Sequence, residues 1–258
     1  MTFLEAKKQL CSGKLNTSYA NIIAAKNQLF SQQNLDDAIN AGIQRAWDYK
    51  IWPFSEATDT ETGSSASNPF SISMTGKGFL GESAFLAIVN GVPWVGQGAG
   101  KRNFRDFMNW FANYPSDKSK IWAEFGGSLY YNANAITVPY TIVVYGKSYA
   151  PVYVTDADDD VLMPFSVESD AGEDTDSSGN AAIILFAYAY LLSSEKKKNA
   201  AQAMQEEKRA YAILDAVWAP IAEGKAQNNP QNQPFFNTQD YFQNNRSTRY
   251  NTNIGNFP

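Results

Sequence analysis

The sequence predicts an α+β protein: a helical bundle from the N- and C-terminal regions, an inserted β-rich lobe and an extended C-terminal tail. Three observations predict this fold class. Apolar residues recur every three or four positions near both ends of the chain, as in amphipathic helices. Between Phe70 and Phe165 they alternate with small polar residues, as in half-buried strands. Beyond Gly224 the composition changes to Asn, Gln and Pro with scattered aromatic residues.

The N-terminal region, residues 1–55, is predicted to supply the first helices of the bundle. A short helix ends at Gly13 and carries Lys7 on the same face as its apolar residues. Thr17 can cap a second helix, because a threonine side chain accepts hydrogen bonds from the free N–H groups of a first turn. An apolar stripe from Tyr19 onward would lie on one face of that helix.

A third helix is predicted after Asn34, which can cap it. Asp36 and Asp37 would lie in its first turn, where the helix dipole favours anions. Its apolar residues recur as far as Trp47. Pro53 closes the region, since the residue before a proline avoids the helical conformation.

Residues 56–176 are predicted to form the inserted lobe with its acidic loop. The lobe opens with a polar loop, Glu56–Asn68, and has one helical pattern, Asn103–Tyr114. An Asn90–Gly91 pair predicts a turn. Runs of alternating aromatic or β-branched and small polar residues predict strands at 70–75, 84–89, 128–136, 137–145 and 149–154.

An acidic stretch, Asp156–Asp176, ends the lobe. It contains nine carboxylates and neither lysine nor arginine. Calcium-loop-like spacings begin at Asp156 and Asp174, but the twelfth positions are Val167 and Leu185, which lack the bidentate carboxylate. We therefore expect a mobile surface loop that holds at most a weak surface cation.

Two helices are predicted in residues 177–226. The first, Asn180–Ser193, is apolar nearly all round and should be central in the bundle. The second, Lys198–Glu223, has a stripe that includes Leu214 and Trp218. We expect both of these side chains to be buried against the first helix.

The extended tail, residues 227–258, is rich in Asn, Gln and Pro, which cannot build a core. We expect it to be disordered in the free subunit and ordered on a partner. The simpler alternative is a tail that packs on its own domain or on a neighbouring subunit. Its aromatic residues are typical of anchors buried at an interface, and its arginines could pair with carboxylates there. The candidate partner-binding residues are Phe235, Phe236, Tyr241, Phe242, Arg246, Arg249, Tyr250 and Phe257.

Composition excludes several kinds of chemistry. The chain has no histidine and one cysteine, Cys11, so histidine-based triads, histidine or cysteine-rich metal sites and internal disulfides are excluded. A formal net charge of −5 disfavours sequence-independent binding to DNA. The apolar run Ala181–Leu192 is too short to span a bilayer, and the first residues lack the apolar core of a signal peptide. We expect no cofactor, no metal and no membrane partner.

Two patterns invite a functional interpretation and also have a simpler one. Gly96–Arg102 resembles a phosphate-binding loop, but Val95 replaces its first glycine and Arg102 its Ser or Thr, so a flexible surface loop is predicted. A set of aromatic residues could stack on sugars but is more typical of a core or an interface. These residues are Trp94, Trp110, Trp122, Tyr130 and Tyr131. No two carboxylates are fixed at a glycosidase distance by the sequence.

The order of these parts resembles the head-to-tail connector (adaptor) proteins of tailed bacteriophages. The resemblance rests on the opening MTFLEAKKQL, on the apolar helix NAAIILFAYAYLL, and on the following helix EEKRAYAILDAVW, in which Ile213–Trp218 is an ALDxxW-like segment. It covers roughly residues 1–52 and 178–224, so the β-rich middle would be an insertion.

The resemblance implies a structural virion protein of the phage neck and no enzyme. Subunits of that family form a ring, here expected to be a dodecamer, that joins the portal of the head to the tail and extends the DNA channel. The tail of the chain would bind the portal protein, and downstream neck or tail proteins would dock on the ring. Genomic DNA would pass through the lumen without specific binding, which an acidic balance favours. We expect synthesis in the host cytoplasm and a final location in the virion.

Three alternatives to this interpretation stay open at the level of sequence. Another virion protein, such as a tail-tube or tail-terminator subunit, would be dominated by a β-sandwich and need little helix. A glycan-binding or glycan-cleaving module would use the aromatic and acidic middle of the chain. A generic helical regulator would give no reason for the β-rich insert.

Overall fold

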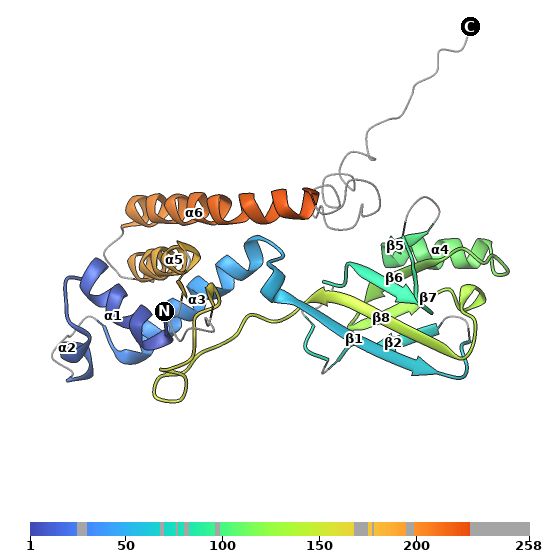
Figure 1. Cartoon of the computed structure of the whole chain (residues 1–258), viewed down its shortest axis with the longest axis horizontal. Coiled ribbons are helices and arrows are strands. Elements are labelled where there is room, and N and C mark those ends of the chain that lie inside the picture. Colours follow the sequence, from blue (N-terminus) through green and yellow to red (C-terminus); the bar gives the residue numbers. More distant parts are fainter. Residues whose placement is uncertain are drawn as a thin grey trace, which may run out of the picture. The chain divides into compact units, whose positions relative to one another are not determined.

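A computed structural model describes residues 1–24, 30–67, 70–75, 77–79, 83–95, 99–167, 175–176, 178–194 and 199–227 (Figure 1). The chain folds into two compact units. A helical unit comprises Met1–Lys50 and the chain from Pro151 onward, and a β-rich unit comprises Ile51–Ala150. The predicted α+β class is confirmed, because helices from both ends of the chain pack together and two four-stranded sheets lie between them in the sequence.

The helical unit is organised around α5 (Ser178–Ser194), against which α1 (Phe3–Lys14), α3 (Gln32–Tyr49) and α6 (Ala200–Gln227) pack. α5 buries side chains around most of its circumference, as its apolar composition predicts. The approach of α3 requires Gly42, since a Cβ at that position would lie 2.6 Å from a backbone oxygen of α5. No helix within these described residues is long and apolar enough to cross a membrane.

The burial predicted for α6 is confirmed. Leu214 and Trp218 are both buried, and α6 packs on α5 along the stripe that contains them. Tyr211 of the same helix meets Phe186 of α5 edge to face, with ring centroids 4.9 Å apart. This contact is the favoured geometry for a pair of aromatic rings and fixes the two helices side by side.

Two of the predicted helix caps are wrong. The short helix α2 (Tyr19–Ile23) is capped by the Ser18 hydroxyl instead of Thr17. α3 is capped by Ser31, and Asn34 is the third helical residue, whose side chain bonds back to the cap. Because α3 begins earlier than predicted, Asp36 lies beyond its first turn and is buried.

The β-rich unit contains two four-stranded sheets, with strand orders β1–β8–β3–β4 and β2–β7–β6–β5. All neighbouring strands are antiparallel except β5 and β6. One apolar cluster draws side chains from both sheets, so their inner faces pack against each other as a sandwich. The strands are β1 (Glu56–Gly63), β2 (Phe70–Ser73), β3 (Leu86–Val89), β4 (Val92–Pro93), β5 (Gly100–Arg102), β6 (Ile121–Phe125), β7 (Ser128–Tyr131) and β8 (Tyr140–Lys147).

Shorter elements complete the two units. The helix α4 (Phe104–Asn113), capped by Asn103, places Phe107 against β6 on the outer face of the second sheet. The turn between β3 and β4 has positive φ at both predicted residues, 50° at Asn90 and 74° at Gly91. The remaining elements are the 3-10 turns η1 (Pro53–Ser55) and η2 (Ala133–Ala135) and the strand pair β9 (Ser166–Val167) and β10 (Thr175–Asp176).

The predicted polar loop Glu56–Asn68 is wrong over its first part. Residues 56–63 are β1, which pairs with β8 along its whole length. Asp59 and Glu61 lie on one face of this strand, and the Lys77 ammonium contacts each of their carboxylates at 2.7 Å. The hydrogen-bonded pairing with β8 and the neutralisation of Asp59 and Glu61 by Lys77 together allow the charged sequence of β1 to form a strand. The strands β4, β5, β6, β9 and β10 were not predicted, and β5 lies in the segment that was expected to be a flexible surface loop. β7 ends at Tyr131, where η2 replaces the expected continuation.

The segment after β8 also differs from expectation. Residues 149–154 were predicted as a strand and have no regular secondary structure. The lobe was expected to continue to Asp176, whereas the chain from Pro151 onward belongs to the helical unit. The physical reason is a set of polar contacts between this segment and helices α1 and α3.

Candidate functional site

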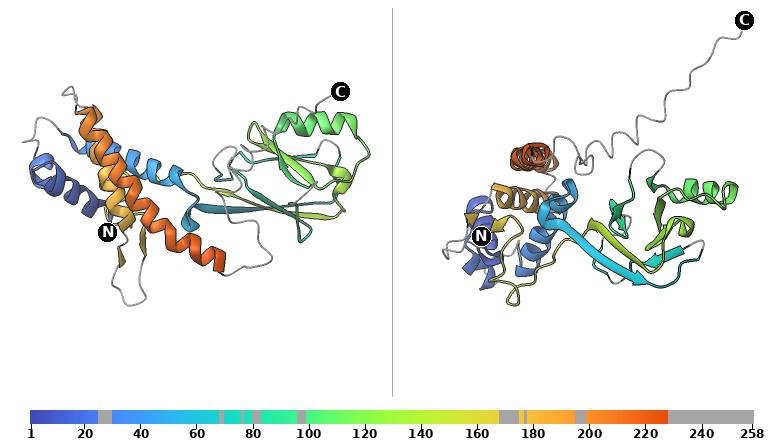
Figure 2. Two further views of the ribbon diagram at one scale, coloured as in Figure 1. Left: turned by 90° about the horizontal axis from the view of Figure 1, so that it is seen from above. Right: turned by 45° about the vertical axis from the view of Figure 1, so that its right-hand side comes forward.

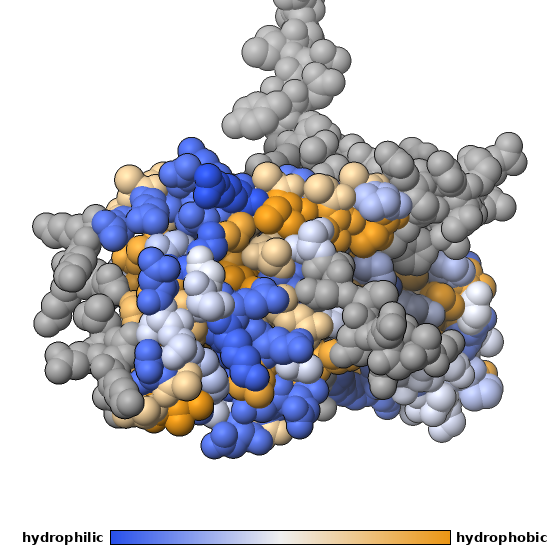
Figure 3. Space-filling model, turned by 60° about the vertical axis from the view of Figure 1, so that its left-hand side comes forward, coloured by the Kyte–Doolittle hydropathy of each residue, from blue (hydrophilic) through white to orange (hydrophobic). Residues whose placement is uncertain are grey.

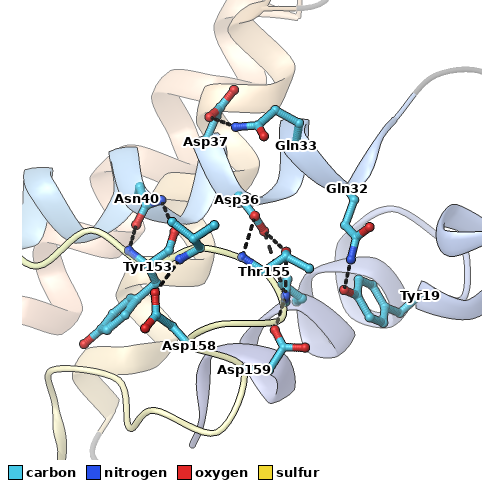
Figure 4. Close-up of polar contacts among 12 residues, drawn as sticks. Tyr19, Gln32, Gln33, Asp36, Asp37, Asn40, Tyr153, Thr155, Asp158 and Asp159 are labelled. Atoms are coloured by element: carbon cyan, nitrogen blue, oxygen red, sulfur yellow. Dashed lines mark hydrogen bonds and ion pairs between the residues drawn. The ribbon is translucent and has the colours of Figure 1, made fainter.

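The most unusual local structure in the helical unit is a non-regular segment, residues 151–163, that α1 and α3 hold by buried polar contacts (Figure 4). We call it the locked segment. Backbone contacts fix one end of it on α1, where Phe3 N donates to Val161 O at 2.9 Å and Leu4 N donates to Asp159 O at 3.1 Å. Side chains of α1 and α3 hold the rest.

Lys7 of α1 is the centre of these contacts. Its side chain is 0% exposed, and its Nζ donates to Thr155 Oγ1 at 2.9 Å and to Asp159 Oδ1 at 2.5 Å. Asp36 Oδ1 of α3 lies 3.9 Å from the same Nζ, and the Phe3 ring centroid lies 4.4 Å away. One buried ammonium therefore faces two carboxylates and an aromatic ring.

The charge state of Lys7 follows from these neighbours. Burial disfavours the ammonium, but the hydrogen bond to Asp159 and the nearby Tyr19 outweigh it, so the pKa of Lys7 is raised. Lys7 is therefore a cation at neutral pH. Removing one partner of a buried ion pair leaves an uncompensated charge. The loss of Lys7, or of a carboxylate that faces it, should therefore destabilise the helical unit.

Two side chains of α3 take the place of a neighbouring β-strand. Asn40 Nδ2 donates to Tyr153 O at 2.8 Å, and Asn40 Oδ1 accepts from Tyr153 N at 2.9 Å. Asp36 accepts from Thr155 N at 3.0 Å and from Thr155 Oγ1 at 2.7 Å. These contacts satisfy the backbone of a strand-like sequence without a sheet, which explains why the strand predicted at 149–154 does not form.

This arrangement reverses the usual distribution of side chains. Tyr153 is buried, whereas Val152 is 71% exposed, Val154 56% and Val161 42%. Asp156 and Asp160 are exposed beside the valines. The locked segment thus presents apolar side chains and carboxylates outward on a backbone that is fixed from beneath.

Over residues 156–161 the acidic stretch is a surface loop, as predicted, with Asp156, Asp160 and Val161 exposed, and its Asp158 and Asp159 side chains and its backbone are bonded to the helical unit. Asp158 Oδ2 accepts from Val154 N at 2.7 Å, and Asp159 pairs with Lys7. Within the described ranges, no three His, Cys, Asp or Glu side chains are grouped to hold a metal ion. Of the second calcium-like set, Asp174 lies outside the described residues.

Two further candidates from the sequence are occupied by structural contacts. The Cys11 thiol is buried, and burial raises its pKa to about 11, so it is protonated at neutral pH and is no nucleophile. In the glycine-rich segment, Gly96–Gly98 lies outside the described residues and Gly100–Arg102 is β5. Lys101 Nζ contacts Glu124 Oε2 at 2.8 Å and Ala84 O at 2.5 Å, which fixes it inside the β-rich unit.

The aromatic residues considered for sugar stacking belong to the core. Trp94, Trp122 and Tyr131 are fully buried between the two sheets, and burial raises the pKa of Tyr131. Trp110 and Tyr130 pack partly buried against the cluster under α4. The core interpretation is confirmed for this set, and the three buried rings have no face on which a sugar could stack.

The eight residues proposed for partner binding, Phe235, Phe236, Tyr241, Phe242, Arg246, Arg249, Tyr250 and Phe257, all lie outside the described residues. Sequence reasoning overlooked the locked segment, for which the signal was a lysine among the apolar positions of the first helix. No protein-family model matches the chain, and no curated protein matches it. The features that bear on function are therefore the two-unit architecture, the locked segment and the resemblance of the terminal regions.

Proposed function

We propose that the protein is a head-to-tail connector of a tailed bacteriophage. Copies of the chain form a ring that joins the portal of the head to the tail and extends the DNA channel. One observation carries the proposal: the N-terminal helices α1 and α3 and the C-terminal helices α5 and α6 pack into one unit, although the whole β-rich unit separates them in the sequence. This is the layout that the resemblance of residues 1–52 and 178–224 implies.

The alternatives receive less support from the fold. A tail-tube or tail-terminator subunit is built on a β-sandwich, and the sandwich here is an insertion into a helical unit that such a subunit does not need. A glycan-binding module would need exposed aromatic faces, but Trp94, Trp122 and Tyr131 are buried. A helical regulator would give no reason for the inserted sheets.

The charge of the chain suits a channel. A formal net charge of −5 allows DNA to pass without adhering, because like charges repel and no counterions are released. In this proposal the residues after α6 bind the portal protein, with their aromatic side chains as anchors and Arg246 and Arg249 as partners for carboxylates. Downstream neck or tail proteins dock on the opposite end of the ring.

Electron microscopy of negatively stained protein tests the proposal. The full-length chain is purified alone and together with the portal protein encoded beside it. We expect rings with a central channel, at least in the presence of the portal, and cosedimentation of the two proteins. A chain that forms no ring and does not bind the portal would overturn the proposal, and binding of the monomer to a glycan would favour the alternative module.

A further inference from the structure

The helical unit carries two exposed surfaces that complement each other in chemistry. The first, which we call the valine–aspartate surface, consists of Val152, Val154, Asp156, Asp160 and Val161 on the locked segment. Apolar residues are exposed here although the backbone beneath them is fixed by Asn40, Asp36 and Lys7. Exposed apolar groups on a fixed backbone are typical of an interaction surface.

The second surface is the outer face of α6. Met204 is 59% exposed, and Lys208 follows it one turn later on the same face, with Arg209 and Ala212 exposed beside it. We call these four residues the methionine–lysine surface. Of the acidic neighbours, Glu207 pairs with Arg45, whereas Glu206 is buried and pairs both with Lys14 and with Arg209 itself, at 3.3 Å. Because the Arg209 side chain is 58% exposed and Lys208 is exposed beside it, the outer side of this surface is apolar and basic. Figure 3 shows apolar residues in a band across the upper part of this side of the molecule, among hydrophilic ones.

The two surfaces lie on opposite sides of the helical unit. α6 packs on α5, whereas the locked segment is bonded to α1 and α3. Figure 1 and the right-hand view of Figure 2 show α6 above α5 and the locked segment below α3. A copy of the chain can therefore use both surfaces at once with two different neighbours.

We infer that the valine–aspartate surface of one copy binds the methionine–lysine surface of the next copy. Valines would pack on Met204 and Ala212, and Asp156 and Asp160 would face Lys208 and Arg209. Contact of either surface with itself would oppose like charges, so the complementarity selects a head-to-tail contact between copies. Such a contact generates rings when the rotation closes. The inference rests on the proposed function and assigns the contact that builds its ring.

Charge reversal tests this contact. The variants are D156K with D160K, K208E with R209E, and all four together, with K118E and K120E in the β-rich unit as a matched control of exposed lysines. Assembly is measured by sedimentation velocity at one ionic strength, with portal present if the ring requires it, and folding by circular dichroism. We expect each double reversal to weaken association about tenfold or more, the fourfold variant to recover part of it, and the control to change nothing.

The outcomes separate this inference from the proposed function. Rings that survive both double reversals would overturn the contact and leave the connector proposal intact. Failure of the wild-type chain to form rings, alone or with portal, would overturn both. Rings that persist after D156K with D160K but no longer bind portal or a neck protein would assign the valine–aspartate surface to that other partner and overturn the inference.

Cysteine crosslinking gives a second, independent readout. The chain has one native cysteine, Cys11, which is buried and protonated, so introduced thiols dominate oxidation. In V154C with M204C, oxidation of assembled protein should give a ladder longer than dimers, because each copy supplies one thiol to each neighbour. Each single variant should remain uncrosslinked, because its thiol has no thiol opposite it in the inferred contact, and I23C with M204C, which adds an exposed position on α2, is the control. A ladder in the control and none in V154C with M204C would refute the contact.

Discussion

Replacing Lys7 by methionine should destabilise the helical unit strongly. The substitution keeps most of the volume of the side chain but removes the ammonium that faces Asp159 and Asp36. Breaking a buried ion pair by removing one partner costs about 3–5 kcal/mol. The Asp36 side chain is 7% exposed and cannot regain its hydration, whereas the Asp159 side chain is 22% exposed and can regain part of it. We therefore expect a loss near the lower end, about 3 kcal/mol.

The assay is urea unfolding followed by circular dichroism at the helical signal, because the two units can unfold in separate transitions. A loss of about 3 kcal/mol corresponds to roughly 6–12 °C in the melting temperature of a unit of this size. The control is K8M, which replaces the next residue of α1, an exposed lysine, and should change stability by less than about 0.5 kcal/mol.

A third variant separates the ion pair from simple packing. Lys7→Met combined with Asp36→Asn and Asp159→Asn removes both uncompensated charges and should recover part of the lost stability. If K7M is as stable as K8M, the ammonium contributes nothing to holding the locked segment, and the role given to Lys7 is wrong.

Three further predictions concern other parts of the chain. Burial, and next its hydrogen bond to Asp215, raise the pKa of Tyr49 to about 12, and the pKa of Lys7 is raised above 10.5. The protonated form of each side chain therefore stabilises the fold in full at pH values below its ordinary pKa, and this stabilisation is lost as the pH rises. Cys11, whose pKa burial raises to about 11, adds to this loss from about pH 9. The free energy of unfolding should therefore fall as pH rises from about 9 to 12, and, without histidine, stay flat between about pH 6 and 8; urea titrations that show a decline between pH 6 and 8 would contradict this. Trp218→Ala should cost about 3–5 kcal/mol, measured by urea unfolding, and an unchanged midpoint would mean that α6 is not held by this ring. A chain ending at Gly224 should unfold at the wild-type midpoint yet fail to join portal-containing heads, and normal attachment would reject the tail as the portal anchor.

The helices and several strands could be predicted because their burial pattern is local. α5 is apolar nearly all round and is central, and the strands β2 and β8 alternate as half-buried strands do, whereas β3 is a short apolar run that is almost wholly buried. The fold class follows from these patterns. Cap positions could not be fixed in the same way, because Thr17, Ser18, Ser31 and Asn34 are all chemically able to cap a helix and only the packed structure selects among them.

The errors arise where partners distant in sequence decide the outcome. Strand β1 has no apolar alternation to reveal it, and its stability comes from β8 and from Lys77. Residues 149–154 do alternate, but α3 supplies side-chain hydrogen bonds in place of a neighbouring strand, so the valines face outward. Asp36 and Asn40 could not be assigned these roles from sequence, since their partners Thr155 and Tyr153 each lie more than a hundred residues away.

The locked segment is costly in two respects, and both costs bear on function. Buried ion pairs are often less stabilising than apolar side chains of the same volume, and a fully buried valine would gain about 1.5–3 kcal/mol that Val152 and Val154 largely forgo. A fold that required only stability would place the valines inside. The arrangement makes sense if the segment must present a fixed surface to another chain, because a surface that is already ordered loses less entropy when it binds.

If the locked segment is a preordered binding surface, the Lys7 contacts that order it should also affect assembly. At a temperature where K7M is still folded, the loosened segment should weaken association between copies, although Lys7 itself is buried and touches no other copy in the inferred contact. K8M is the matched control, and dichroism verifies that both variants are folded. Sedimentation velocity measures the association of each variant. Folded K7M that assembles as tightly as K8M would show that the order of the locked segment is irrelevant to the contact, and the valines would then need another explanation.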